Sequence, residues 1–313
     1  MGEISHRIVE ANGIKMHIAE QGKGPLVLLL HGFPSLWYTW RHQIPVIANA
    51  GYHVVAPDMR GFGQTEAPED PTKYTFLNTV GDVVSLIHTL GEKQACLVGH
   101  DWGALVTWLT ALLRPDVVKC VVTLNVSFLP RDPKYSILDQ MRAMAGERVY
   151  AMEWQEPGKA EADLERDIKQ TFEKLYAYRT PELLTATESK SVLENMPAPE
   201  KLPAWITDED IKVYVETFSK TGFTGGLNWY RNLDRSWELL APWTGLGISV
   251  PGFVIVGDVD LSAKFTRSYL ESPRFKADCP NGEYKFIPGC AHFIQEEAPE
   301  VINNLILEYL KRH

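Results

Sequence analysis

The sequence predicts an α/β fold with a mostly parallel central sheet into which a helical segment is inserted. Short apolar runs rich in Val, Leu and Ile alternate with amphipathic segments in both outer parts of the chain. Continuous apolar runs are typical of parallel strands, because helices cover both faces of such a sheet. Between about residues 130 and 242 this alternation stops and charged helical stretches take over. The sheet is therefore expected on either side of an insertion.

The strands can be assigned in order along the chain. The runs 7–9 and 15–19 are joined through Asn12-Gly13, a strong hairpin turn signal, and predict an antiparallel pair at the start. The parallel strands and their crossover helices follow from apolar runs and from helical periodicity. We expect strands at 26–30, 53–56, 95–98, 118–124, 250–256 and 284–287, and helices at 78–90, 104–113 and 299–311.

The middle of the chain has the composition of a helical cap. Charged helical stretches at 160–176 and 208–220 alternate with Pro-rich and Gly-rich turns, and strand-like runs disappear. We predict a core formed by residues 1–130 and 242–313, with a cap at 131–241. Ligands of open α/β sheets bind beyond the carboxyl ends of the strands, so the active site is expected between core and cap.

Composition excludes several classes of partner. The chain has 313 residues, of which 45% are hydrophobic, and its 31 Lys and Arg against 40 Asp and Glu give a formal net charge of -9. No basic run could follow a phosphate backbone, so no nucleic-acid partner is expected. The longest apolar run, at about residues 26–30, is far below the roughly 18 residues of a membrane span, and residues 1–10 have no signal-peptide core. We expect a cytoplasmic protein, either a monomer or a weak homodimer.

Cysteine and histidine spacing indicates neither disulfides nor a metal. The four cysteines form no C-x-x-C pair, and we expect all of them to be reduced. Two of them, Cys96 and Cys120, lie inside apolar runs and are expected to be buried. None of the nine histidines has metal-ligand spacing. No metal or cofactor is therefore expected.

The stretch 99–103, Gly-His-Asp-Trp-Gly, has the glycine spacing of a nucleophile elbow with an aspartate at its tip. It follows the strand predicted at 95–98 and precedes the helix predicted at 104–113, which is the context that an elbow requires. A carboxylate nucleophile attacks saturated carbon and forms an ester on the enzyme. An aspartate at position 101 therefore indicates that the electrophile of the substrate is an sp3 carbon with a leaving group. Taken alone, the motif could equally be a simple turn.

An acid and a histidine follow in the chain order of hydrolase triads. The strand at 250–256 leads to Asp258 and Asp260, and the strand at 284–287 leads to His292. Taken singly, these residues are more often helix caps or solvated groups. Their joint order favours a catalytic pair with Asp101. The strand at 26–30 ends in His-Gly-Phe-Pro, where hydrolases place one oxyanion-hole amide, so the backbone N–H groups of Phe33 and Trp102 are the candidate donors.

These residues together resemble the soluble epoxide hydrolases, the plant type most closely. The resemblance covers the whole chain, and it rests on the two motifs above and on three further stretches: 37–43 (WYTWRHQ), 56–63 (APDMRGFG) and 227–231 (LNWYR). It implies an α/β-hydrolase fold with a helical cap and an apolar epoxide and water as substrates. It also implies that Asp101 opens the epoxide and that water activated by the His292-Asp260 pair hydrolyses the ester.

The same resemblance singles out further residues. It selects Asp260 over Asp258 as the acid, leaving Asp258 as a cap or supporting group, and it implies that Tyr150 and Tyr230 of the cap protonate the epoxide oxygen. From the sequence alone, cap tyrosines are usually packing residues.

Two departures from the family pattern bear on the reaction. Ser35 stands where the family usually has an acid that organises the hydrolytic water, and residues 261–264 lack the expected aromatic and His residues. We expect Ser35→Glu to speed ester breakdown up to roughly tenfold, unless a buried glutamate costs stability instead. Two alternative functions remain: a cyclase, in which a hydroxyl of the substrate opens the epoxide in place of water, and a non-catalytic ligand receptor on the same fold. A haloalkane dehalogenase would be expected to have Asn at Phe33 to bind halide.

Overall fold

The computed structural model describes residues 3–180 and 184–313, and its centre is one eight-stranded sheet. The strands lie in the order β1-β2-β4-β3-β5-β6-β7-β8. Among the strands of the described residues, only the pairs β1·β2 and β2·β4 are antiparallel, which confirms the mostly parallel sheet and the hairpin at its start. The strands are β1 (Ser5–Ala11), β2 (Ile14–Gln21), β3 (Leu26–Leu30), β4 (His53–Pro57), β5 (Ala95–His100), β6 (Val118–Leu124), β7 (Gly252–Gly257) and β8 (Gly282–Ile287).

Helices cover both faces of this sheet, as the apolar strands require. In β3, Leu28 and Leu30 pack on one face with residues of α2 and α3, whereas Val27 and Leu29 pack on the other face with α1 and α15. The helices outside the cap are α1 (Ile44–Asn49), α2 (Phe76–Thr89), α3 (Trp102–Leu113), α12 (Ala263–Leu270), α13 (Pro273–Asp278), α14 (Ile294–Glu297) and α15 (Pro299–Leu310), with the 3₁₀-helices η1 (Trp37–Trp40), η2 (Pro71–Tyr74), η3 (Pro115–Val117) and η4 (Ala241–Trp243).

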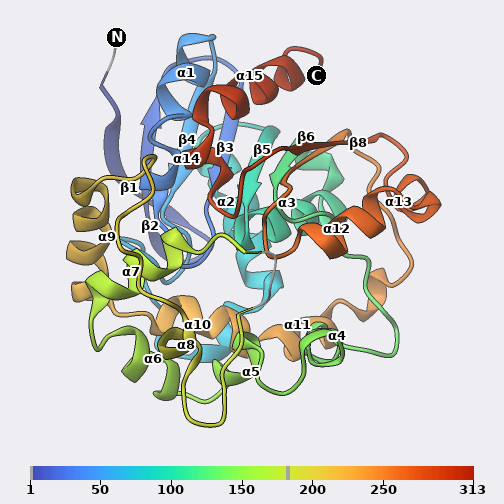
Figure 1. Cartoon of the computed structure of the whole chain (residues 1–313). Coiled ribbons are helices and arrows are strands. Elements are labelled where there is room, and N and C mark those ends of the chain that lie inside the picture. The colour runs from blue at the N-terminus through green and yellow to red at the C-terminus, as the bar shows by residue number, and fades with distance from the viewer. Residues whose placement is uncertain (1–2, 181–183) are drawn as a thin grey trace.

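Helices also dominate the segment between β6 and β7, for which we keep the name cap (residues 131–241). Figure 1 shows α5, α6, α8 and α10 on the opposite side of the molecule from α1, α15 and both termini. The cap helices are α4 (Ile137–Ala145), α5 (Tyr150–Glu153), α6 (Lys159–Leu164), α7 (Ile168–Ala177), α8 (Val192–Asn195), α9 (Asp208–Thr221), α10 (Thr224–Arg231) and α11 (Leu233–Leu239).

Two expectations about local structure were wrong. The helix expected at 160–176 is divided into α6 and α7, because the Asp167 side chain accepts the N–H of Gln170 and caps a new helix. The strand expected at 250–256 begins two residues later, after Pro251, which has no N–H to donate.

The register of the central strands brings distant segments to one edge of the sheet. Leu30 at the end of β3 pairs with Gly99 of β5, so residues 31–34 begin beside the elbow. Leu124 at the end of β6 pairs with His100 on one side and with Ile255 of β7 on the other. Within the described part of the chain, no helix is both long and apolar enough to cross a membrane.

Candidate active site

Asp101 lies at the tip of a sharp turn between β5 and α3. Its backbone φ of 53° and ψ of -121° lie in a region that residues other than glycine rarely adopt. Such strain persists only where the surroundings hold it, and it is common at functional sites. A Cβ on Gly103 would lie 2.0 Å from the carbonyl oxygen of Leu30, and one on Gly32 would lie 2.1 Å from Oδ1 of Asp101. Both glycines therefore allow the backbone to approach closely, as the elbow interpretation requires.

One oxygen of the Asp101 carboxylate is held by the backbone amide of Phe33. The N–H of Phe33 donates to Oδ1 at 2.8 Å, and the N–H of Trp102 also donates to the carboxylate. The other oxygen, Oδ2, lies 3.7 Å from Nε2 of His292. The two carboxylate oxygens thus have different environments, one bound by the Phe33 amide and one facing an imidazole.

His292 is oriented from its other ring nitrogen by Asp260. Nδ1 of His292 lies 2.7 Å from Oδ2 of Asp260, a carboxylate with a fully buried side chain. The second oxygen of Asp260 accepts the N–H of Ser262 at 2.6 Å and also the Ser262 hydroxyl. Asp258 is exposed and points elsewhere, since it accepts the N–H of Gly289 at 2.7 Å. Asp260, not Asp258, therefore contacts the histidine.

Two residues that support His292 were missed in the sequence. The carbonyl oxygen of His292 lies 2.6 Å from Nδ2 of Asn125 and 2.7 Å from Nε2 of His100. Asn125 also accepts the N–H of Gly257 and has a φ of 65° directly after β6. Nothing adjacent in sequence links Asn125 to residue 292, and only the strand order brings them together. His100 lies inside the motif that identified Asp101, but that motif specifies its glycines and its nucleophile rather than this position.

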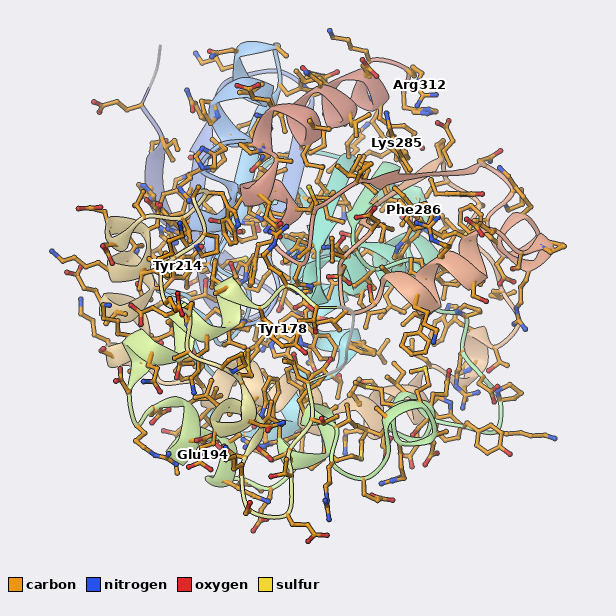
Figure 2. All side chains as sticks on the ribbon, viewed as in Figure 1. Tyr178, Glu194, Tyr214, Lys285, Phe286 and Arg312 are labelled. Atoms are coloured by element: carbon orange, nitrogen blue, oxygen red, sulfur yellow. The ribbon has the colours of Figure 1, made fainter. Side chains whose placement is uncertain are left out.

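Tyr150 of α5 and Tyr230 of α10 face Asp101 from the cap. The two rings lie 5.8 Å apart between centroids, and both line a cavity of about 60 Å³ that also contains Asp101 and His292. A second cavity of about 120 Å³ is again lined by Asp101 and both tyrosines, and it extends toward Leu129. Tyr178, on the wall of the first cavity, lies near the middle of the view in Figure 2, between the cap below and the sheet above.

Burial and charge shift the pKa values of these groups. Burial strongly raises the pKa of Tyr150 and of Tyr230, and the charge of Asp101 adds to this effect. For His292, burial lowers the pKa, but the carboxylates of Asp260 and Asp101 outweigh it and raise the pKa to about 9. For Asp101 itself, burial raises the pKa against the opposing effects of His292 and the two amides. The phenols are therefore protonated at neutral pH, and His292 carries a positive charge.

Ser35 is fully buried beside the cap rather than facing the open cavity. Its hydroxyl makes no well-formed hydrogen bond to a described residue. It lies near the hydroxyls of Tyr176 and Tyr214, whose pKa values are raised by burial, and it lowers both of these pKa values in part. Tyr214 in turn donates to Oε1 of Glu296 at 3.3 Å. Ser35 thus belongs to a buried cluster of hydroxyls.

Comparison with known proteins identifies the family. A sequence model described as the alpha/beta hydrolase fold matches residues 25–299. Epoxide hydrolase 2 of Siraitia grosvenorii is 45% identical over 100% of both chains, and Epoxide hydrolase A of Mycobacterium tuberculosis is 39% identical over 99% of this chain and 98% of its own. The chain belongs to the epoxide hydrolases of the α/β-hydrolase fold. The resemblance found in the sequence is thereby confirmed, as is the fold class.

Solved plant structures extend this epoxide hydrolase family likeness to three dimensions. The crystal structure of an epoxide hydrolase from Vigna radiata superposes with a TM-score of 0.96 at 47% identity, covering 99% of this chain and 98% of the other. Potato (Solanum tuberosum) epoxide hydrolase I superposes with a TM-score of 0.94 at 40% identity, covering 99% of this chain and 100% of the other. In this epoxide hydrolase, no described group of three or more His, Cys, Asp and Glu side chains is arranged to hold a metal ion.

Proposed function

We propose that this epoxide hydrolase converts an apolar epoxide into a vicinal diol in two steps, through an ester on Asp101. The observation that carries the proposal is the division of the Asp101 carboxylate, with Oδ1 bound by an amide at 2.8 Å and Oδ2 lying 3.7 Å from His292 beneath two tyrosines. A carboxylate with one oxygen fixed and one oxygen toward the cavity is suited to nucleophilic attack.

In the first step, Oδ2 of Asp101 attacks an epoxide carbon. The carbon–oxygen bond of the ring breaks, a new ester bond forms, and the freed epoxide oxygen takes a proton from Tyr150 or Tyr230. Burial raises the pKa of both phenols, so both protons are in place at neutral pH. General acids of this kind typically contribute about 10² to 10⁴ in rate.

In the second step, water attacks the ester carbonyl carbon. His292 takes the proton of the water, and Asp260 stabilises the resulting imidazolium through the bond to Nδ1. The negative charge that develops on Oδ1 is stabilised by the N–H groups of Phe33 and Trp102. The intermediate collapses by breaking the bond from the carboxyl carbon to Oδ2. That oxygen takes the proton of the newly formed carboxylic acid and leaves with the diol, which returns Asp101 to its carboxylate form.

The first step itself prepares the base for the second. His292 must be neutral to accept a proton, yet the charges of Asp260 and Asp101 hold its pKa at about 9 despite burial. Esterification removes the negative charge of Asp101, and the tyrosinate left by ring opening takes up the proton that His292 releases. We expect the pKa of His292 to fall in the ester, because one of the carboxylates that raise it is then neutral.

The cavities indicate the shape of the substrate. Asp101, Tyr150 and Tyr230 line both the 60 Å³ and the 120 Å³ cavity, and we therefore put the reacting carbon beside these three residues. The first cavity is lined largely by apolar and aromatic side chains, including Trp154, and the second by side chains such as Met141. We infer an epoxide that carries an apolar substituent on each side, covered by the cap at 131–241.

A single turnover in heavy-oxygen water tests this proposal. With styrene oxide in deficit, the diol should carry an unlabelled oxygen from Asp101, and the label should appear in a peptide containing Asp101. His292→Gln should form the ester but not release it, so the protein mass should rise by one substrate. Solvent label in the first diol formed would mean direct attack by water, and the nucleophile assignment would then be abandoned.

A further inference from the structure

The loop that carries His292 is held by one buried carboxylate, that of Glu297, and we call this contact the clamp. Glu297, whose side chain is only 4% exposed, accepts the N–H of Ala291 at 2.9 Å and the N–H of Phe293 at 3.1 Å. These two amides flank His292 on either side in the sequence. One carboxylate therefore fixes both peptides that determine how the imidazole is aimed, while Asn125 and His100 hold the carbonyl between them.

The cap reaches this clamp through Arg179. Its guanidinium pairs with Oε2 of Glu297 and also donates to the carbonyl oxygen of Gly289, at the start of the same loop. Tyr176, three residues earlier, stacks on Phe293 with 3.9 Å between ring centroids and an interplanar angle of 8°. Tyr178, between these two contacts, lines the cavity that contains Asp101. One cap segment thus touches both the substrate cavity and the histidine loop.

We propose that Glu297 and Arg179 are positioning residues for the hydrolysis of the ester, with Arg179 acting through Glu297 to couple the cap to the aim of His292. This inference rests on the function proposed above. Charge-assisted bonds to backbone amides are short and strong, and a pair of them restricts a loop more than one does. Misplacing a reacting group by about 1 Å can cost on the order of 10²-fold in rate.

The clamp should affect the second step and not the first. Ring opening uses Asp101 at the elbow together with Tyr150 on α5 and Tyr230 on α10, which are positioned by other elements. Water activation needs the imidazole aimed at the ester, and the loop that aims it contains both amides bound by Glu297. A structural tether with no such role would alter both steps together through loss of the folded site.

Single-turnover kinetics of Glu297→Gln and Arg179→Met separate these possibilities. Quenched samples give the amount of ester on Asp101 by mass and the amount of diol against time, with styrene oxide as the probe. We expect ester breakdown to slow by about tenfold in Glu297→Gln, which keeps the size of the side chain but loses an acceptor, with ester formation within about twofold of the unsubstituted rate. Arg179→Met should also slow ester breakdown without slowing ester formation, but by a smaller factor. Arg179→Lys should restore much of the rate of ester breakdown.

The double variant and a matched control complete the test. If Arg179 acts through Glu297, the double variant should break down its ester no more slowly than Glu297→Gln alone. Arg166→Met removes another cap arginine that pairs with a glutamate, Glu194, and should change neither step. Equal loss of both steps in the Glu297 and Arg179 variants, or unchanged breakdown, would overturn the positioning role. Absence of any ester in His292→Gln would overturn the proposed function itself.

Discussion

Tyr150 and Tyr230 are phenols whose surroundings keep them protonated. Both rings pack against Trp154 at 4.9 Å between centroids, and burial raises the pKa of each phenol. Each phenol therefore keeps its proton at neutral pH. The same packing would suit a purely structural tyrosine, and for this reason the sequence could not assign the role without the resemblance.

Replacing both tyrosines by Phe should stop ester formation while leaving the fold intact. In a His292→Gln background, Tyr150→Phe with Tyr230→Phe should slow the rise in protein mass by about 10² to 10⁴, because no acid then protonates the epoxide oxygen. Tyr135→Phe is the control, since Tyr135 is an exposed cap tyrosine outside both cavities, and it should leave the rate unchanged. A double variant that forms ester at the original rate would remove both tyrosines from the mechanism.

The buried position of Ser35 changes the effect that we expect from the substitution Ser35→Glu. Its side chain is fully buried among the hydroxyls of Tyr176 and Tyr214, and the carboxylate of Glu296 lies next along the cluster. Burial already raises the pKa of Glu296 against the effect of Arg41. A second carboxylate here would face a like charge in a site with little water.

We therefore expect Ser35→Glu to destabilise the protein rather than to accelerate ester breakdown. A buried group without a partner costs about 1–3 kcal/mol, and a charged group costs more, so the midpoint of urea unfolding should fall. Ser35→Thr, which keeps the hydroxyl, is the control for added volume. Faster ester breakdown without loss of stability would instead support the role of an acid at this position in water positioning.

At the scale of elements, the contact between α3 and β3 sets the geometry of the elbow. A Cβ on Gly103 would lie 2.0 Å from the Leu30 carbonyl oxygen, and neither backbone can move away without shifting Asp101 or Trp102. Gly81 in α2 is a useful contrast, because a Cβ there would meet only the side chain of Asn12, at 2.8 Å.

Gly103→Ala should cost about 1–3 kcal/mol by overpacking and should also slow ester formation, because the elbow and the Trp102 amide are displaced together. Gly81→Ala should change stability far less and leave the rate of ester formation unchanged. Urea unfolding and single-turnover mass measurements give both quantities. If Gly103→Ala lost stability but kept its rate, the close approach would matter for folding alone.

The contrast between Asp101 and Glu297 indicates what a sequence can reveal about such a site. Asp101 lies in a short motif whose glycines and flanking apolar runs identify a strand, a turn and a helix, so its position could be predicted. Glu297 and Asn125 reach His292 only through the order of strands and the path of a loop, which no local pattern encodes. The break between α6 and α7 was missed for a smaller reason, because Asp167 as a cap looks like any other charge in a helical stretch.

For the whole molecule, a buried ion network joins core and cap. Arg41, directly after η1, pairs with Glu296 of α14 at 2.6 Å and with Asp210 of the cap helix α9 at 3.1 Å. Asp210 also accepts the hydroxyl of Tyr38 at 2.9 Å. Removing one partner of a buried pair leaves the other charge unpaired, so such contacts restrict how the cap can sit on the core.

The pH dependence of stability should report the charge state of His292. In the folded protein, burial lowers the pKa of His292, but Asp260 and Asp101 raise it to about 9, whereas an unfolded histidine titrates near ~6.5. The folded state binds this proton more tightly, so the stabilisation is fully present below pH about 6.5 and is lost as the pH rises through about 9. Relative to His292→Gln, the free energy of unfolding of the unsubstituted protein should therefore fall across this window, measured by urea unfolding at closely spaced pH values. Asp101→Asn should narrow this pH window, because one of the carboxylates that raise the pKa of His292 is gone. Parallel curves of unfolding free energy against pH for all three proteins would show that His292 is not held in its charged form.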